Sequence, residues 1–124
     1  MKTLVHSLAN TLLLGFDDPG GAPLKAPAPH VYTKAIASSG DLIASLSGVA
    51  ELTRALGFTV APETLYAPGG RSATYHADHQ EASVSIAVEC NPTTQTVALA
   101  VSGLDGDETY HHFLETAQTL FGDG

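Results

Sequence analysis

The segment from Arg71 to Ser102 alternates apolar and polar residues with a period of two, which is typical of β-strands that bury one face. Two polar stretches, His79-Gln80 and Asn91-Pro-Thr-Thr94, divide it and have the composition of turns. With these turns, the large aliphatic side chains all fall on one face. The pairs expected across the strands are Val88 with Val97, Ile86 with Leu99, Val84 with Val101, Tyr75 with Val84, and Ala73 with Ile86. The segment therefore predicts an antiparallel meander.

Further elements surround this meander. His30–Ala37 has the β-branched and aromatic content of a strand, and the SSGD that follows offers an N-cap for a helix from about Leu42 to Gly57. The stretch FTVAPETLY predicts a short strand broken or placed at an edge by Pro62, and APGG after it predicts a turn. The apolar residues of the last predicted helix are Tyr110, Phe113, Leu114, Ala117, Leu120 and Phe121.

The N-terminal part of the chain differs in character from the rest. Apolar residues at spacings of three and four predict an amphipathic helix over residues 1–14, and four prolines with three glycines make residues 15–29 an irregular connection. Residues 30–124 form the main body. We expect a single α+β domain over residues 1–124, with an antiparallel meander of four to five strands and with helices, including a C-terminal amphipathic helix, on one face.

Composition excludes several classes of function. Thirteen acidic residues against five scattered basic ones give a formal net charge of -8, which argues against binding to nucleic acid or to an anionic membrane. The apolar run near the start is interrupted by His6, Ser7 and Asn10, is too short to span a membrane, and has no convincing cleavage site after it. The lone Cys90 is compatible with a reducing compartment, so we expect a cytoplasmic protein.

The stretch TYHADHQE, residues 74–81, raises the question of a metal site. His76, Asp78 and His79 are potential ligands of a divalent ion such as zinc, with Glu81 or a distant residue such as His111 or His112 as a further candidate. On a strand, however, residues three apart face opposite ways, so His76 and His79 should diverge. We favour a polar hairpin tip without a cofactor, and keep a small metal-dependent enzyme or metal-binding protein as the alternative.

No catalytic constellation emerges from the remaining residues. The sequence has no Gly-x-Ser-x-Gly elbow, and Glu89 next to Cys90 should raise the pKa of the thiol, which favours a structural cysteine. The glycine pairs match no phosphate-binding loop. In the final helix, Glu108, His112 and Glu115 lie opposite the apolar residues and are expected on a solvated face.

The other face of the predicted meander is unusual for a solvated surface because its side chains are nearly all small. The expected interface residues on this face are Thr74, Ser85, Ala87, Ala98 and Ala100. Exposed strands do accept serine and threonine, but small side chains also allow another layer to approach closely. The layer could be the first helix, the proline-rich connection or a second copy. The sequence thus predicts a small acidic, non-enzymatic interaction module, a homodimer that also binds another protein or a small ligand.

Overall fold

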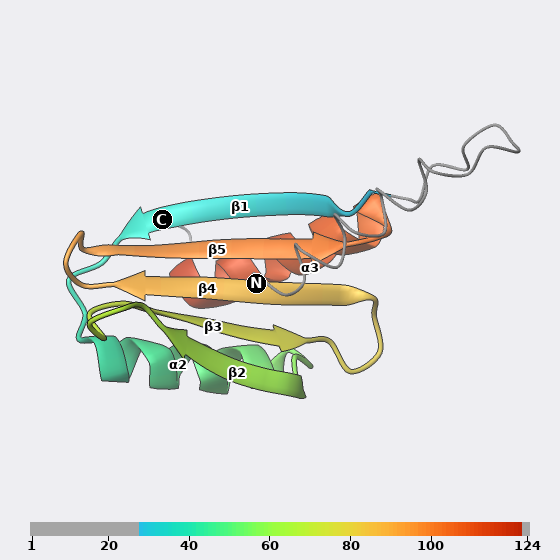
Figure 1. Cartoon of the computed structure of the whole chain (residues 1–124). Coiled ribbons are helices and arrows are strands. Elements are labelled where there is room, and N and C mark those ends of the chain that lie inside the picture. The colour runs from blue at the N-terminus through green and yellow to red at the C-terminus, as the bar shows by residue number, and fades with distance from the viewer. Residues whose placement is uncertain (1–27, 123–124) are drawn as a thin grey trace, which may run out of the picture.

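The computed structural model describes residues 28–122 and confirms the predicted α+β fold. The predicted helix over residues 1–14 and most of the predicted connection over residues 15–29 lie outside the described residues. All neighbouring strands are antiparallel, in the order β1-β5-β4-β3-β2 (Figure 1). The strands are β1 (His30–Ala37), β2 (Val60–Tyr66), β3 (Ala73–Asp78), β4 (Val84–Asn91) and β5 (Thr96–Gly103).

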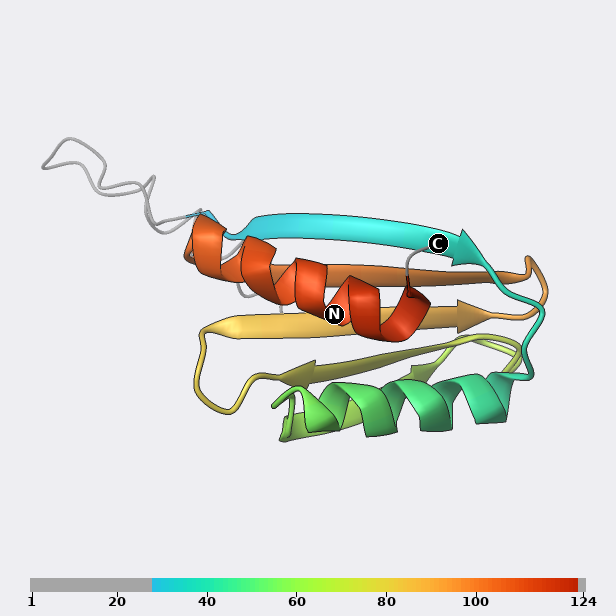
Figure 2. The same cartoon turned by 180° about the vertical axis from the view of Figure 1, so that it is seen from behind.

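Both helices, α2 (Leu42–Ala55) and α3 (Gly106–Phe121), lie on the same face of the sheet. In Figure 2, α2 packs against β3 and β4, and α3 packs mainly against β1 and β5. The Asp41 side chain accepts a hydrogen bond from the backbone N–H of Ala44 and so caps α2, and Asp105 caps α3 in the same way through Glu108. The Asp41 cap confirms where the sequence predicted the first of these helices to begin.

The hydrophobic core fills the layer between the sheet and the two helices. Phe58, in the loop after α2, is 1% exposed, and Leu46 and Val49 of α2 are also buried. The side chains that the sheet contributes come from alternate positions of three strands. They are Ala73, Tyr75, Ala77, Val84, Ile86, Val88, Cys90, Val97, Leu99 and Val101. Apart from Ala77 and Cys90, these are the residues that the predicted strand pairs placed on the buried face.

The turns of the meander are not where the sequence placed them. Between β4 and β5 the loop is Pro92–Gln95, because Asn91 stays paired with Thr96 and its side chain accepts a hydrogen bond from the Thr94 N–H at 3.3 Å. Between β3 and β4 the loop runs over residues 79–83. The observed pairs are therefore Cys90 with Val97, Val88 with Leu99, Ile86 with Val101, Val84 with Gly103, Tyr75 with Val88, and Ala73 with Cys90. The predicted register was wrong in both hairpins, by an even number of residues each time, so the buried face was unaffected.

The edge strand β2 has the irregularity that its proline predicted. The pairing of β2 with β3 is interrupted between Val60 and Glu63, and Ala61 has a φ of 49°. Pro62 lies at this bulge, where a missing N–H removes no regular ladder bond. The turn after β2 closes with a hydrogen bond from Gly70 N to Ala67 O at 2.8 Å.

No helix within residues 28–122 is long and apolar enough to cross a membrane.

Candidate functional site

The sheet face that turns away from both helices carries the five residues that the sequence predicted as an interface. We call this surface the open face. The strand pairing aligns its side chains in rows that cross the sheet. One row is Leu65, Thr74, Glu89, Ala98 and Ala35; the next is Glu63, His76, Ala87, Ala100 and Thr33; the third is Asp78, Ser85, Ser102 and Val31.

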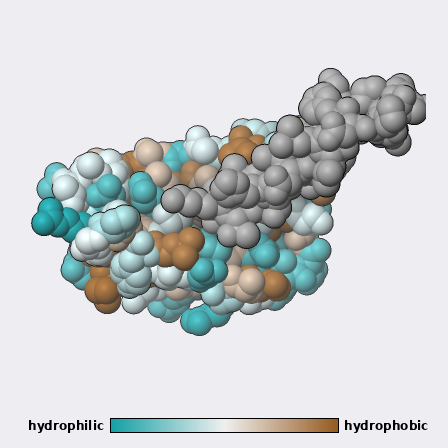
Figure 3. All heavy atoms as spheres, viewed as in Figure 1, coloured by the Kyte–Doolittle hydropathy of each residue, from teal (hydrophilic) through white to brown (hydrophobic). Residues whose placement is uncertain are grey.

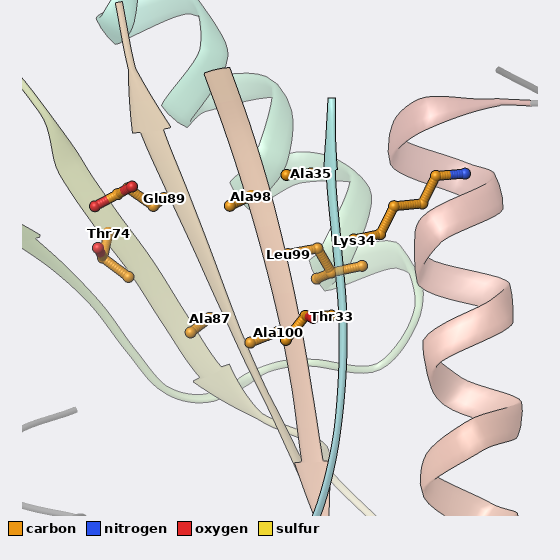
Figure 4. Close-up of a pocket in the computed structure, with 9 residues that line it drawn as sticks. All are labelled: Thr33, Lys34, Ala35, Thr74, Ala87, Glu89, Ala98, Leu99 and Ala100. Carbon is orange, nitrogen blue, oxygen red and sulfur yellow. The ribbon is translucent and has the colours of Figure 1, made fainter. Parts of the chain in front are cut away.

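Alanines occupy the centre of the open face, and a shallow hollow of about 410 Å³ lies above them. Thr33 and Ala35 of β1 line it on one side, and Thr74 of β3 and Glu89 of β4 on the other. Figure 4 shows Lys34 directed toward α3, whereas Glu89 and Thr74 extend on the opposite side of the sheet. A hollow with mostly short apolar side chains and one carboxylate lacks the convergent polar groups that fix a small substrate.

Larger apolar side chains lie toward the edges of the open face. Val31 on β1 is 55% exposed, and Leu65 and Val60 on β2 are also exposed. Figure 3 looks onto this side of the molecule and shows brown hydrophobic surface among pale and teal surface where it is not grey. Polar residues are interspersed: Asp78 accepts a hydrogen bond from Ser85 Oγ at 2.6 Å. An apolar centre with scattered polar groups is the usual composition of a protein interface.

The potential metal ligands of TYHADHQE do not converge. His76 and Asp78 project on the open face, two residues apart along β3, but His79 follows the strand and packs on the helix side against Phe58. His76 Nε2 lies 3.7 Å from Glu63 Oε2 and has no hydrogen-bond partner among the described residues. Within residues 28–122, no three His, Cys, Asp or Glu residues are placed to hold a metal ion.

His79 has a structural part in the β3–β4 loop. Its Nδ1 accepts hydrogen bonds from the backbone N–H groups of Glu81 and Ala82, at 3.1 and 3.0 Å. Its Nε2 lies 3.2 Å from the carbonyl oxygen of Leu56, at the end of α2. Because Nδ1 accepts twice, Nε2 carries the proton and donates to Leu56. The ring thus joins the loop to α2, and both of its nitrogens are occupied.

His112 was predicted on a solvated face of the last helix, and this was wrong. It is half-buried, with its ring 4.6 Å from that of His79 and 5.9 Å from that of Phe58, measured between centroids. Thr109 and Thr116 are fully buried, whereas Tyr110 and Leu114 are each 46% exposed. The buried face of α3 is therefore rotated relative to the predicted apolar stripe and includes both threonines. His111 is exposed and joins neither ring.

Cys90 is buried, as expected of a structural cysteine, and is 1% exposed. Burial, together with the neighbouring Glu89 carboxylate, raises the pKa of its thiol. The thiolate is therefore scarce at neutral pH, which excludes Cys90 as an activated nucleophile.

Sequence reasoning missed what the two edge strands add to the open face. Thr33 and Ala35 of β1 extend the central rows, because β1 pairs with β5. The period of two in HVYTKAIA assigns these two residues to the face opposite Tyr32 and Ile36, but nothing in the sequence states which strand β1 joins. Leu65 enters from β2 in the same way.

Searches against protein-family models, curated proteins and solved structures find no match to this chain.

Proposed function

We propose that this chain is a non-enzymatic protein–protein interaction module that forms a homodimer through the open face. The observation that carries the proposal is a five-stranded sheet with both helices on one side and, on the other, small side chains centred on Ala87, Ala98 and Ala100. A face exposed only to water has no need of alanine at its centre, where longer polar side chains are better solvated. Ala87 is already buried, and removal of the partly exposed Ala98 and Ala100 from water would stabilise an assembly.

The size of the open face suits a stable two-fold dimer. Five strands about 4.8 Å apart and about 3.3 Å per residue span on the order of 600 Å² in flat projection. The corrugated accessible surface is larger than this, and a typical specific interface buries about 800 Å² per partner. Two copies of the same face can meet about a two-fold axis, with the alanines at the centre and a mixture of apolar and polar side chains around them.

Native mass spectrometry of the full chain tests this proposal, with Ala100→Glu as the disruptive variant. Ala100 lies between Ala87 and Thr33 in the central row, so each copy would bury an unpaired carboxylate. We expect a dimer for the wild type and at least a tenfold weaker dimer for the variant. Ser47→Glu, on the exposed surface of α2, adds the same charge on the other side of the sheet and should leave the dimer intact.

Three results would contradict the proposal. They are a wild-type mass of one subunit, an Ala100→Glu dimer as stable as the wild type, and an equal loss in Ser47→Glu. If a monomeric wild type becomes dimeric after removal of residues 1–27, the occupant of the open face is that segment rather than a second copy. A retained zinc mass would instead support the metal-dependent alternative.

We place the protein in the cytoplasm as part of the same proposal, since the unpaired Cys90 fits a reducing compartment.

A further inference from the structure

The outer edge of β1 presents backbone groups that no described residue pairs. Ser38 N donates to Gln95 O at 2.8 Å, and this pair continues the register that sets Ile36 opposite Val97. In an antiparallel ladder, directly opposed residues exchange their hydrogen bonds at every second position. The even-numbered residues of β1 therefore bond to β5. The N–H and C=O groups that point away from β5 belong to Val31, Thr33, Ala35 and Ala37.

The opposite edge of the sheet is closed to such pairing. On β2, Pro62 lacks an N–H, and the bulge between Val60 and Glu63 twists the strand out of register. Proline, a bulge and a charged residue are features by which proteins protect an edge from strand addition. β1 has eight residues without proline or a bulge, and its one lysine, Lys34, is directed toward α3, so β1 remains a regular edge.

Two exposed apolar residues of α3, Tyr110 and Leu114, lie on the helix side beside the free edge of β1, and we call this surface the ledge. The Tyr32 ring packs against Tyr110 and Phe113 of α3, with centroids 5.1 and 5.8 Å apart. Tyr110 and Leu114, one helical turn apart, remain 46% exposed. A strand added at β1 would place every second side chain on this ledge, and the alternate ones would continue the open-face rows that end at Thr33 and Ala35.

The His30 end of β1 is acidic. The His30 ring lies against Gly106, since a Cβ placed there would be 3.2 Å from its Cε1. This contact brings the start of α3, with exposed Asp107 and Glu108, to the same end of the strand. A lysine or arginine on an incoming segment would meet these carboxylates, and the chain's net charge of -8 favours a basic partner generally.

We propose that the free edge of β1 is a strand-addition site for an extended segment of a partner polypeptide, with apolar residues at alternate positions and a basic residue at the end beside His30. This site uses the outward backbone groups of β1 at the margin of the open face, and it does not depend on the homodimer. A second copy of β1 fits the edge less well. Its helix-side residues cannot cover the ledge, because Tyr32 already packs on Tyr110 of its own α3 and Ile36 on its own core.

The test uses random twelve-residue peptides displayed on phage and selected against the full chain. We expect enriched sequences that alternate apolar residues and carry Lys or Arg at one end. Affinity of a selected, fluorescently labelled peptide is then compared in Thr33→Pro and Thr33→Val. The proline removes an outward N–H and no bond to β5, so we expect at least tenfold weaker binding, whereas valine keeps the backbone donor and should bind like the wild type. Circular dichroism melts confirm that each variant folds, and Ala35→Pro serves as a second edge variant.

Amide hydrogen exchange followed by NMR gives an independent readout. In the free protein, the amides of Val31, Thr33 and Ala35 should exchange quickly and those of Tyr32 and Lys34 slowly, and the added peptide should protect the first group. The absence of enriched peptides, equal binding to Thr33→Pro, or unchanged exchange would overturn the strand-addition site. Ala100→Glu should not alter peptide affinity, so failure of the homodimer and failure of this site are distinguishable. Self-association that is lost in Thr33→Pro but kept in Ala100→Glu would overturn the choice of a partner segment over a second copy.

Discussion

Replacement of His79 by alanine should destabilise the fold, although the residue sits in a polar loop that resembles a ligand site in sequence. The change removes the acceptor for two backbone N–H groups and the donor to the Leu56 carbonyl. Glu81 N is at the exposed end and can be hydrated, so the main losses are the partly buried bonds of Ala82 and Leu56, about 1 kcal/mol each. Loss of ring contacts with Phe58 and His112 adds about 1 kcal/mol.

The expected total is therefore about 3 kcal/mol of unfolding free energy, or a fall in Tm on the order of 15 °C for a domain of this size. Urea and thermal unfolding followed by circular dichroism measure it. His79→Asn should lose less, because asparagine can still accept from the loop N–H groups. His111→Ala, at an exposed position of α3, should stay within about 0.5 kcal/mol of the wild type. The reasoning would be refuted by His79→Ala within that same margin, or by His79→Asn falling below His79→Ala.

Two further predictions concern the packing of the sheet and the buried thiol. Gly103→Ala should cost about 1 to 3 kcal/mol in urea unfolding, because its Cβ would lie 2.8 Å from the Ser83 carbonyl oxygen and collide with the Thr109 hydroxyl. Gly48→Ala, where an added Cβ meets nothing within 4 Å, should instead stabilise α2 by about 0.5 to 1 kcal/mol. A change of unfolding free energy with the same sign in both variants would contradict this account. Because the pKa of Cys90 is raised in the folded protein, the unfolded thiol ionises at a lower pH than the folded one. The contribution of this thiol to stability is therefore present at neutral pH and is lost as the pH rises past the ordinary thiol pKa. Between about pH 7 and about pH 10 the wild type should lose more unfolding free energy than Cys90→Ala, and equal losses would show that the thiol makes no such contribution.

The sequence predicted the buried face of the sheet but not its register, and the reason is physical. A period of two assigns each residue to a face, and a slip of two residues leaves that assignment unchanged. Register is set instead by loop geometry, here the Asn91 side chain in one hairpin and the His79 ring in the other. Both depend on contacts that form only when the loop closes. A hairpin tip made of polar residues does not reveal which of them remain in the ladder.

The open-face residues could be predicted because faces follow from sequence alternation, whereas their neighbours across the sheet could not. Thr33 joins the central row only because β1 pairs with β5, a pairing between opposite ends of the described chain. Helix α3 gives the same lesson on a smaller scale. Its hydrophobic pattern predicts a helix, but its buried face also includes two threonines, and His112 packs on the His79 ring. A scale that ranks threonine and histidine as polar cannot anticipate this.

The pairing of β1 with β5 also has a consequence for the order in which the chain folds. β1 leaves the ribosome before every other strand of the sheet, but its partner is the last strand to be made. The β2–β5 meander consists of sequence neighbours, so its contacts can form while β1 is still without a ladder. The sheet is completed only when β1 pairs with β5, the two neighbouring strands that are farthest apart in the described sequence. Until then the regular strand HVYTKAIA is exposed to other nascent chains.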